Sequence, residues 1–365
     1  MKINLIVFIS EFNLGGAGNS LFRLCKYLPK KIFEITVICL NTCSYKKELK
    51  KNNIKVYEIK ASKTIFAMTK VRNITKELIK KKIKKNIFLS NIYYSNILSV
   101  LFLRDLDLKM ILVERTPFQE LNIYYGIINF LKKNFLKILI YFTYKKADLC
   151  ISNSNYISQV YNKKYNLNFK TIYPPSFTQN LKYKKKIIKN KKKIELVTVC
   201  RLSKEKGLEN FLKIIPQLKK EIIFHIFGDG PEKNKLKKLC KNLGIEKNTI
   251  FYGSIKQSKV ISKIINYDLF INCSDFEGFP NSVVEAIGSG IPVIASQSHG
   301  GINEIIKNNS FGYIYRNHED LIKIINNYGS GKIKFNLKRN IVKNHLNNFS
   351  ISENIKKYSN VFKKI

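Results

Sequence analysis

The stretch S-D-F-E-G-F-P-N-S-V-V-E-A at positions 274–286 joins a turn to the start of a helix and is the most informative segment of the chain. It holds two carboxylates eight positions apart. Glu277 lies in the turn, and Glu285 is expected about two turns into the helix. The helix start, where free backbone N–H groups can hold an anion, comprises Phe279, Pro280, Asn281 and Ser282. The stretch therefore predicts a polar site for an anionic ligand.

Two further motifs precede this stretch and fit the same kind of ligand. Arg201 and Lys206 follow a strand expected at Ile194–Cys200, and two cations at a strand end could neutralise a diphosphate. The next expected strand runs into the turn G-D-G-P, in which Gly228 and Gly230 permit close approach of a backbone to a ligand. The order of these motifs predicts one site built from several strand ends.

The fold class follows from apolar, β-branched runs that alternate with helical patterns along the whole chain. In the first half the expected strands are Lys2–Ile9, Phe33–Leu40, Val56–Ile59, Asn86–Ser90, Met110–Glu114, Leu149–Asn153 and Lys170–Tyr173. In the second half they are Ile194–Cys200, Ile222–Gly228, Thr249–Tyr252, Leu269–Asn272, Val293–Ser296 and Gly312–Tyr315. This alternation predicts an α/β protein with two Rossmann-like, doubly wound parallel sheets.

The expected domain boundaries follow from a Lys-rich segment in mid-chain. We expect a first domain at 1–176, a linker at 177–193, where lysines replace apolar residues, and a second domain at 194–345. A helix at about 346–365 is expected to pack back on the first domain. Ligands of wound sheets bind at the carboxyl ends of the strands, so a cleft between the two domains is the expected site.

The first domain carries its own candidate residues. Gly16 lies in a Gly-rich loop between the first strand and a helix, a place that suits a phosphate. A dinucleotide fingerprint would need a small residue where Leu21 stands, so NAD binding is not expected. Glu114 and Arg115 follow a strand at the same edge of the expected sheet. They could bind a ligand or form a buried ion pair.

The charge of the chain is strongly positive. Its 365 residues include 66 Lys and Arg against 25 Asp and Glu, a net charge of +41. The excess is spread evenly and forms no nucleic-acid-binding module, so nucleic acid is not an expected partner. A solvated surface and attraction to an anionic membrane both remain open. The basic, aromatic segment Ile127–Lys146 could likewise be a membrane-surface helix or part of the core.

Metal and cofactor chemistry have little support in the sequence. The seven Cys and four His show no ligand spacing. The D-x-D pattern of Asp105 and Asp107 stands next to basic residues and is interpreted as a solvated turn. We therefore expect no metal site and no cofactor.

With these motifs in order, the chain resembles the retaining GT-B glycosyltransferases of family 4, the glycosyltransferase group 1 family, whose E-x7-E motif is matched by Glu277 and Glu285. The resemblance implies that Arg201 and Lys206 hold the diphosphate of a nucleotide-sugar donor, that Glu285 holds its ribose, and that Glu277 orients the sugar and stabilises charge. It also implies donor contacts at Gly16, Gly228, Gly230 and the helix start, without a metal. Cys200 departs from the family, which commonly has Gly there.

Because Glu114 and Arg115 resemble an S-E-R-x-P-like run of relatives that build surface polysaccharides, the resemblance implies that they bind the acceptor. The expected reaction moves a sugar from a UDP-sugar to a polyprenyl-diphosphate-linked saccharide, on the inner face of the cytoplasmic membrane. Two alternatives stay open: a nucleotide-sugar epimerase of GT-B-like fold, and a non-catalytic basic membrane adaptor.

Overall fold

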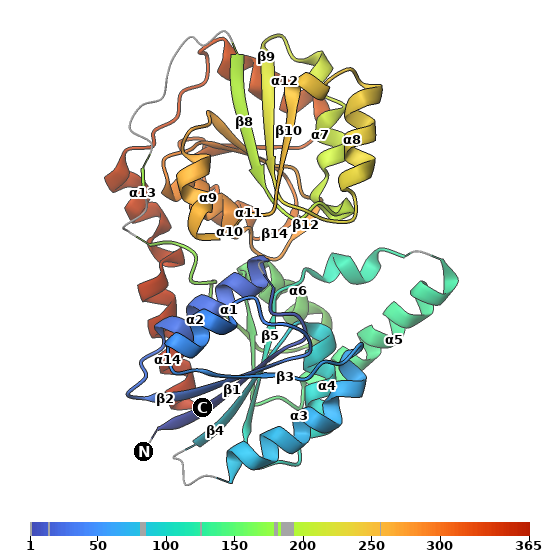
Figure 1. Cartoon of the computed structure of the whole chain (residues 1–365), viewed down its shortest axis with the longest axis vertical. Helices are drawn as coiled ribbons and strands as arrows, with labels where there is room; N and C mark the ends of the chain where they lie inside the picture. The colour runs from blue at the N-terminus through green and yellow to red at the C-terminus, as the bar shows by residue number, and fades with distance from the viewer. Residues whose placement is uncertain are drawn as a thin grey trace. The chain divides into compact units, whose positions relative to one another are not determined.

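A computed structural model of the chain describes residues 2–13, 15–80, 85–124, 126–178, 182–183, 193–255 and 257–365. The chain forms two α/β units, one made of Met1–Pro175 with Ile351–Ile365 and the other of Ser176–Ser350. Each unit is a parallel sheet flanked by helices (Figure 1), which confirms the expected pair of Rossmann-like domains. Most of segment 177–193, the expected linker, lies outside the described residues.

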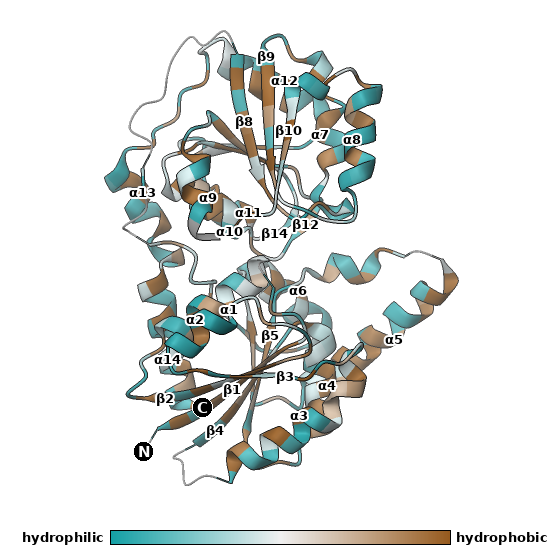
Figure 2. Cartoon of the chain, in the orientation of Figure 1, coloured by the Kyte–Doolittle hydropathy of each residue, from teal (hydrophilic) through white to brown (hydrophobic). Residues whose placement is uncertain are grey.

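The first unit is built on a seven-stranded parallel sheet of order β3-β2-β1-β4-β5-β6-β7. The strands are β1 (Ile3–Ile9), β2 (Phe33–Cys39), β3 (Lys55–Glu58), β4 (Lys85–Asn91), β5 (Lys109–Glu114), β6 (Leu149–Ser152) and β7 (Phe169–Thr171). All seven residues of β1 are buried because helices cover both faces of the sheet, and six of the seven are apolar (Figure 2). The strand order reverses between β1 and β4, so the carboxyl ends of these two strands are the expected ligand site.

Helices cover the two faces of this sheet as separate layers. One layer holds α1 (Gly16–Tyr27), α2 (Lys46–Lys51) and the C-terminal α14 (Ile351–Lys364). The other holds α3 (Thr64–Ile79), α4 (Tyr93–Leu103), α5 (Ile127–Tyr144) and α6 (Asn155–Tyr165). The ring of Phe362 on α14 lies 5.9 Å from that of Phe33 on β2, so the end of the chain is part of the core of the first unit.

The second unit has a six-stranded parallel sheet of order β10-β9-β8-β11-β13-β15. Its strands are β8 (Lys193–Val199), β9 (Glu221–Phe227), β10 (Thr249–Gly253), β11 (Leu269–Asn272), β13 (Val293–Ser296) and β15 (Gly312–Tyr315); β12 (Phe276–Glu277) and β14 (His299–Gly300) pair separately. The helices are α7 (Leu208–Leu212), α8 (Lys233–Asn242), α9 (Gln257–Ile264), α10 (Asn281–Gly288), α11 (Ile302–Ile305), α12 (His318–Gly329) and α13 (Arg339–Leu346). Here the order reverses between β8 and β11.

In the part of the chain that the structure describes, no helix is long and apolar enough to cross a bilayer.

Candidate functional site

The candidate site of the second unit begins at the carboxyl ends of β8 and β11, where the strand order reverses. Lys206 lies in the loop after β8 and Glu277 in β12, the segment that follows β11. The Lys206 Nζ lies 2.8 Å from Glu277 Oε1, and the two side chains are only 18% and 14% exposed. The fold thus brings two predicted site residues, far apart in sequence, into a largely buried ion pair.

The Glu277 carboxylate is held by three donors that meet at one of its oxygens. Besides Lys206, the Ser274 hydroxyl donates to Oε1 at 2.7 Å and the Asn272 amide donates to it at 3.3 Å. Oε2 accepts no hydrogen bond from the residues that the structure describes. One oxygen therefore fixes the side chain, and the other can accept a hydrogen bond from a ligand.

Both members of this pair are charged at neutral pH. Burial raises the pKa of Glu277, but the Lys206 charge and the three hydrogen bonds together lower it by more, so the net shift is downward. Burial lowers the pKa of Lys206, but the Glu277 carboxylate raises it by more, so the net shift is upward. A fixed cation and a fixed carboxylate thus stand side by side at the strand ends.

Two glycines allow the loops around this pair to pack closely. Gly300 has a φ of +145°, and a Cβ there would lie 1.4 Å from the Glu277 carbonyl oxygen, across the β12–β14 pair. Gly207 has a φ of +63°, and its Cβ would lie 2.0 Å from the carbonyl oxygen of Cys273. No other residue fits at these positions without moving the backbone that carries Glu277 and Lys206.

Gly228 and Gly230 hold the next turn against the loop that carries Arg201. A Cβ on Gly228 would lie 1.8 Å from the Cys200 carbonyl oxygen, and one on Gly230 would lie 2.3 Å from that of Leu202. Arg201 itself is exposed, and its guanidinium has no hydrogen-bond or ion-pair partner in the described part of the chain. The turn therefore fixes a loop from which one cation extends freely.

The start of α10 lies directly after Glu277 in the chain. No side chain caps it and its first turn contains no acidic residue, so the positive end of its dipole favours an anion. Phe279 and Pro280 are buried there, whereas Asn281 and Ser282 are partly exposed. Glu285 is 3% exposed and lies about one turn into α10, not two as expected, because the helix begins only at Asn281.

In the first unit, Glu114 has internal partners for both of its carboxylate oxygens. Oε1 accepts from the backbone N–H groups of Arg115 and Thr116 at 2.9 and 3.0 Å, and Oε2 accepts from the Tyr144 hydroxyl at 2.8 Å. The residue is fully buried, and this burial raises its pKa to about 7. Glu114 is therefore placed to hold the loop after β5.

Unlike Glu114, Arg115 keeps side-chain hydrogen-bonding atoms without a partner among the described residues. It is 8% exposed, and its Nε donates to the Asn91 side-chain oxygen at the end of β4 over 3.1 Å. No residue of the described chain accepts from its two terminal nitrogens. The two side chains form no ion pair, so the buried-pair alternative is not what the structure has. Acceptor binding by either residue stays a prediction.

The loop before α1 places Gly16 at the first position of that helix. The N-terminus of α1 has no side-chain cap and no acidic residue in its first turn. A Cβ on Gly18 would lie 2.1 Å from the Asn13 carbonyl oxygen, which explains why a small residue follows the turn. Like the start of α10, this helix start presents the positive end of its dipole to an anion.

Metal ligands do not gather among the described residues, where no three His, Cys, Asp or Glu side chains could share an ion. Asp105 instead forms a two-pronged pair with Arg72, with both oxygens 2.5 Å from guanidinium nitrogens. The hydrogen bond with Arg72 lowers the pKa of Asp105 to about 2. Asp107 is exposed.

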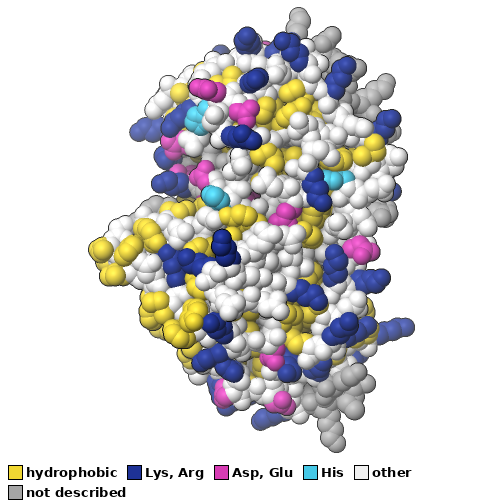
Figure 3. All heavy atoms as spheres, turned by 180° about the vertical axis from the view of Figure 1, so that it is seen from behind, with side chains coloured by type: hydrophobic (Ala, Val, Ile, Leu, Met, Phe, Trp, Pro, Cys, Tyr) yellow, Lys and Arg dark blue, Asp and Glu magenta, His cyan; other side chains and the backbone are white. Residues whose placement is uncertain are grey.

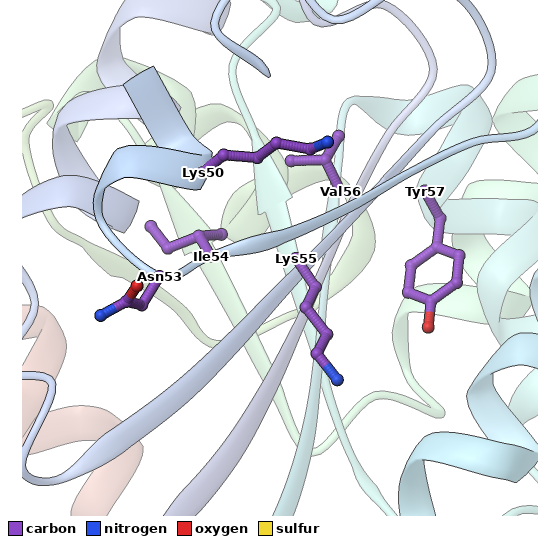
Figure 4. A pocket seen from close by; sticks show the side chains of 6 residues that line it. All are labelled: Lys50, Asn53, Ile54, Lys55, Val56 and Tyr57. Carbon is purple, nitrogen blue, oxygen red and sulfur yellow. The ribbon is translucent and has the colours of Figure 1, made fainter. Parts of the chain in front are cut away.

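An open hollow of about 590 Å³ lies elsewhere, at the edge strand β3 (Figure 4). Its lining consists of Lys50, Asn53, Ile54, Lys55, Val56 and Tyr57. It includes none of the residues that the sequence singles out and no carboxylate, so it adds no chemistry to the candidate site.

Comparisons with known proteins agree with this arrangement. The family Glycosyl transferases group 1 matches residues 179–346, and the family Glycosyltransferase Family 4 matches residues 14–175. An uncharacterized glycosyltransferase of Methanocaldococcus jannaschii, MJ1069, is 29% identical over 100% of this chain and 99% of its own. A lipopolysaccharide 1,6-galactosyltransferase of Salmonella typhimurium is 36% identical over 30% of this chain and 32% of its own. The structure of Anabaena HepE in complex with UDP and glucose superposes with a TM-score of 0.79 at 17% identity, covering 99% of this chain and 100% of that one.

Proposed function

Because this chain belongs to the group 1 glycosyltransferases of family 4 and has their two-domain GT-B fold, we propose that it moves a sugar from a UDP-sugar to a saccharide acceptor with retention of configuration. The observation that carries the donor proposal is the Glu277 carboxylate, whose Oε1 is saturated by three donors while Oε2 is open. HepE, which has the same fold, is seen with UDP and glucose, and this supports a uridine nucleotide.

The donor diphosphate is neutralised by protein cations in this proposal. Lys206 is held by Glu277 and keeps two further N–H donors, and Arg201 extends freely from the neighbouring loop. Together with the positive end of the α10 dipole, these cations stabilise the charge that develops on the leaving phosphate. No metal is needed for that step, and Glu285 holds the ribose.

Glu277 acts as an orienting residue rather than a proton acceptor. Its pKa is lowered, and its one open oxygen accepts a hydrogen bond from a sugar hydroxyl. Its negative charge also stabilises the positive charge that builds up at the anomeric carbon of the donor. The leaving phosphate oxygen then takes the proton of the incoming acceptor hydroxyl on the same face, which retains the configuration.

The acceptor is assigned to the first unit, where Arg115 offers two open donor nitrogens. A planar guanidinium binds a phosphate well, and the diphosphate of a polyprenyl-linked saccharide is such a group. The net charge of +41 adds attraction to an anionic bilayer, which would place the enzyme on the inner face of the cytoplasmic membrane. The lipopolysaccharide galactosyltransferase among the relatives supports a role in surface polysaccharide synthesis.

The experiment that tests this proposal measures the melting temperature with UDP, GDP, ADP and CDP, and then turnover with a panel of UDP-sugars. A nucleotide at 100 times its Kd adds about 2.7 kcal/mol to the stability of the folded protein. We expect UDP to raise the melting temperature most and the shift to shrink in Arg201→Gln. Turnover then distinguishes the alternatives. Sugar transfer supports the proposal, epimer formation would show that the protein is an epimerase, and no turnover with any UDP-sugar would favour a non-catalytic adaptor.

A further inference from the structure

The outer side of α5 carries a row of exposed apolar side chains, which we name the α5 ridge. The ridge consists of Ile128, Leu131, Phe135, Ile138 and Phe142, which are 81%, 60%, 59%, 53% and 58% exposed. Their spacing of three and four positions places them on one side of the helix over its whole length. The opposite side of α5 is buried in the core through Leu136, Ile140 and Tyr144. The ridge is therefore apolar without contributing to the fold.

The charges on the helix that carries the α5 ridge are all positive. The helix Ile127–Tyr144 contains three lysines and no acidic residue. Lys132 and Lys145 are exposed, and their Nζ atoms lie 5.4 and 3.8 Å from the rings of Tyr94 and Tyr141. Figure 3 shows hydrophobic and basic side chains together over this part of the first unit. An apolar strip bordered by lysines and aromatic rings has the composition of a helix that lies in a membrane interface.

Other exposed apolar side chains lie at the same edge of the first sheet as the start of the ridge. Phe66, near the start of α3, is 68% exposed, and Tyr94, near the start of α4, is 37% exposed. The helices α3, α4 and α5 follow β3, β4 and β5 in the chain, so they all begin at the carboxyl edge of the parallel sheet. Glu114 and Arg115 lie at that edge. The apolar surface and the candidate acceptor residues thus share one edge.

We propose that the α5 ridge is buried in the interfacial region of an anionic lipid bilayer, so that the enzyme is held by apolar contact as well as by charge. The proposal rests on the lipid-linked acceptor proposed above and assigns the contact to one helix. A second copy of the chain is a poorer occupant, because pairing two ridges would bring lysines together with no carboxylate of α5 to offset them. With three lysines in its 18 residues, α5 lies along the bilayer and does not cross it.

The absence of tryptophan from the chain allows a direct test. In Phe135→Trp, the new indole is the only one, and its emission reports whether the ridge leaves water. We expect a blue shift, and quenching by brominated lipid, on adding vesicles of phosphatidylglycerol and phosphatidylcholine. The matched control is Tyr27→Trp, because Tyr27 is 47% exposed at the end of α1, on the other face of the sheet, and its emission should not move.

Salt separates apolar contact from adsorption by charge. At about 1 M NaCl the Debye length falls to about 3 Å and surface attraction is screened. Apolar burial predicts that part of the protein still sediments with vesicles at this salt concentration. It also predicts that Leu131→Gln/Phe135→Gln reduces this residual binding by about tenfold or more, whereas Tyr27→Gln leaves it unchanged. Circular dichroism checks that the variants keep their helices.

Two results would overturn the proposal. One is an indole emission of Phe135→Trp that vesicles do not change. The other is a blue shift that appears without lipid and grows with protein concentration, which would assign the ridge to a second copy. Transfer to a water-soluble saccharide is measured without vesicles on the same variants. If the ridge does not bind lipid but the chain is a transferase, this transfer is seen and the vesicle signals are not. If the chain is not a transferase, no variant and no wild-type protein shows transfer, and the vesicle signals still report on the ridge.

Discussion

Replacing Lys206 with Met removes the cation that compensates Glu277 while leaving the carboxylate in place. Both side chains are less than one-fifth exposed, so the charge left behind remains largely buried. Removing one partner of such a pair costs about 3–5 kcal/mol, and because a little water reaches this pair we expect the lower end. For a unit of 150–250 residues, 3 kcal/mol corresponds to a fall of about 6–12 °C in melting temperature.

The assay is the melting temperature of four proteins without ligand: wild type, Lys206→Met, Glu277→Gln and the double variant. The double variant should melt at a higher temperature than Lys206→Met, because removing the stranded charge relieves its desolvation cost. The control is Lys213→Met, which breaks an exposed pair with Glu209, 48% and 36% exposed, and should lower the melting temperature by less than about 2 °C.

The pH dependence of Lys206→Met gives an independent check. The Lys206 charge is the largest influence that lowers the pKa of Glu277 against the effect of burial, so its removal raises that pKa. Acid then protonates Glu277 and relieves the buried charge, so the variant should lose less stability at pH 5 than at pH 8. A double variant no more stable than Lys206→Met, together with an equal loss at both pH values, would refute this account of the pair.

Three other outcomes follow from the same structure. Gly300→Ala should lower the melting temperature and abolish UDP binding, because its Cβ would lie 1.4 Å from the Glu277 carbonyl oxygen. The control Gly244→Ala has open space around it and should lose only about 1 kcal/mol of stability, from its positive φ. Glu114 has a pKa of about 7 in the fold, above its unfolded value, so its contribution to stability should fall by about 3 kcal/mol as pH rises from 4.5 to 7 and then level off. Thermal melts of Glu114→Gln over the same pH range should lack this slope. Sugar transfer should survive EDTA, since Arg201 and Lys206 supply the positive charge at the diphosphate, and loss of activity restored by Mn²⁺ would contradict that role.

The strands could be read from the sequence to within about two residues. The expected Lys2–Ile9 is Ile3–Ile9 in the fold, and Lys170–Tyr173 is Phe169–Thr171. Central strands of a wound sheet are buried on both faces, so they leave continuous apolar runs in the sequence. The paired β12 and β14 leave no such signal. Each has two residues, and their pairing depends on the fit of Gly300 against Glu277, which only the folded chain brings together.

The candidate site could be predicted as a set of residues but not as a network. Lys206 and Glu277 are 71 positions apart, and nothing in their spacing shows that they pair. Ser274 and Asn272 donate to the same carboxylate. Ser274 stands in the quoted motif without a predicted role, and Asn272 was not singled out, although its place at the end of a strand just before Glu277 is a signal that could have found it. For Glu114, the partner hydroxyl of Tyr144 comes from a helix 30 positions later, beyond any local pattern.

Whether Glu277 orients the donor sugar in a retaining transfer is tested most directly by proton NMR. The spectra compare the product that wild type and Glu277→Ala each form from an α-linked UDP-sugar. We expect an α-linked product from the wild type. We also expect a rate about 30- to 1000-fold lower in the variant, which corresponds to losing about 2–4 kcal/mol of charged hydrogen bonding. UDP should still raise the melting temperature of that variant. A β-linked product would contradict retention, and a wild-type rate in Glu277→Ala would contradict the orienting role of Glu277.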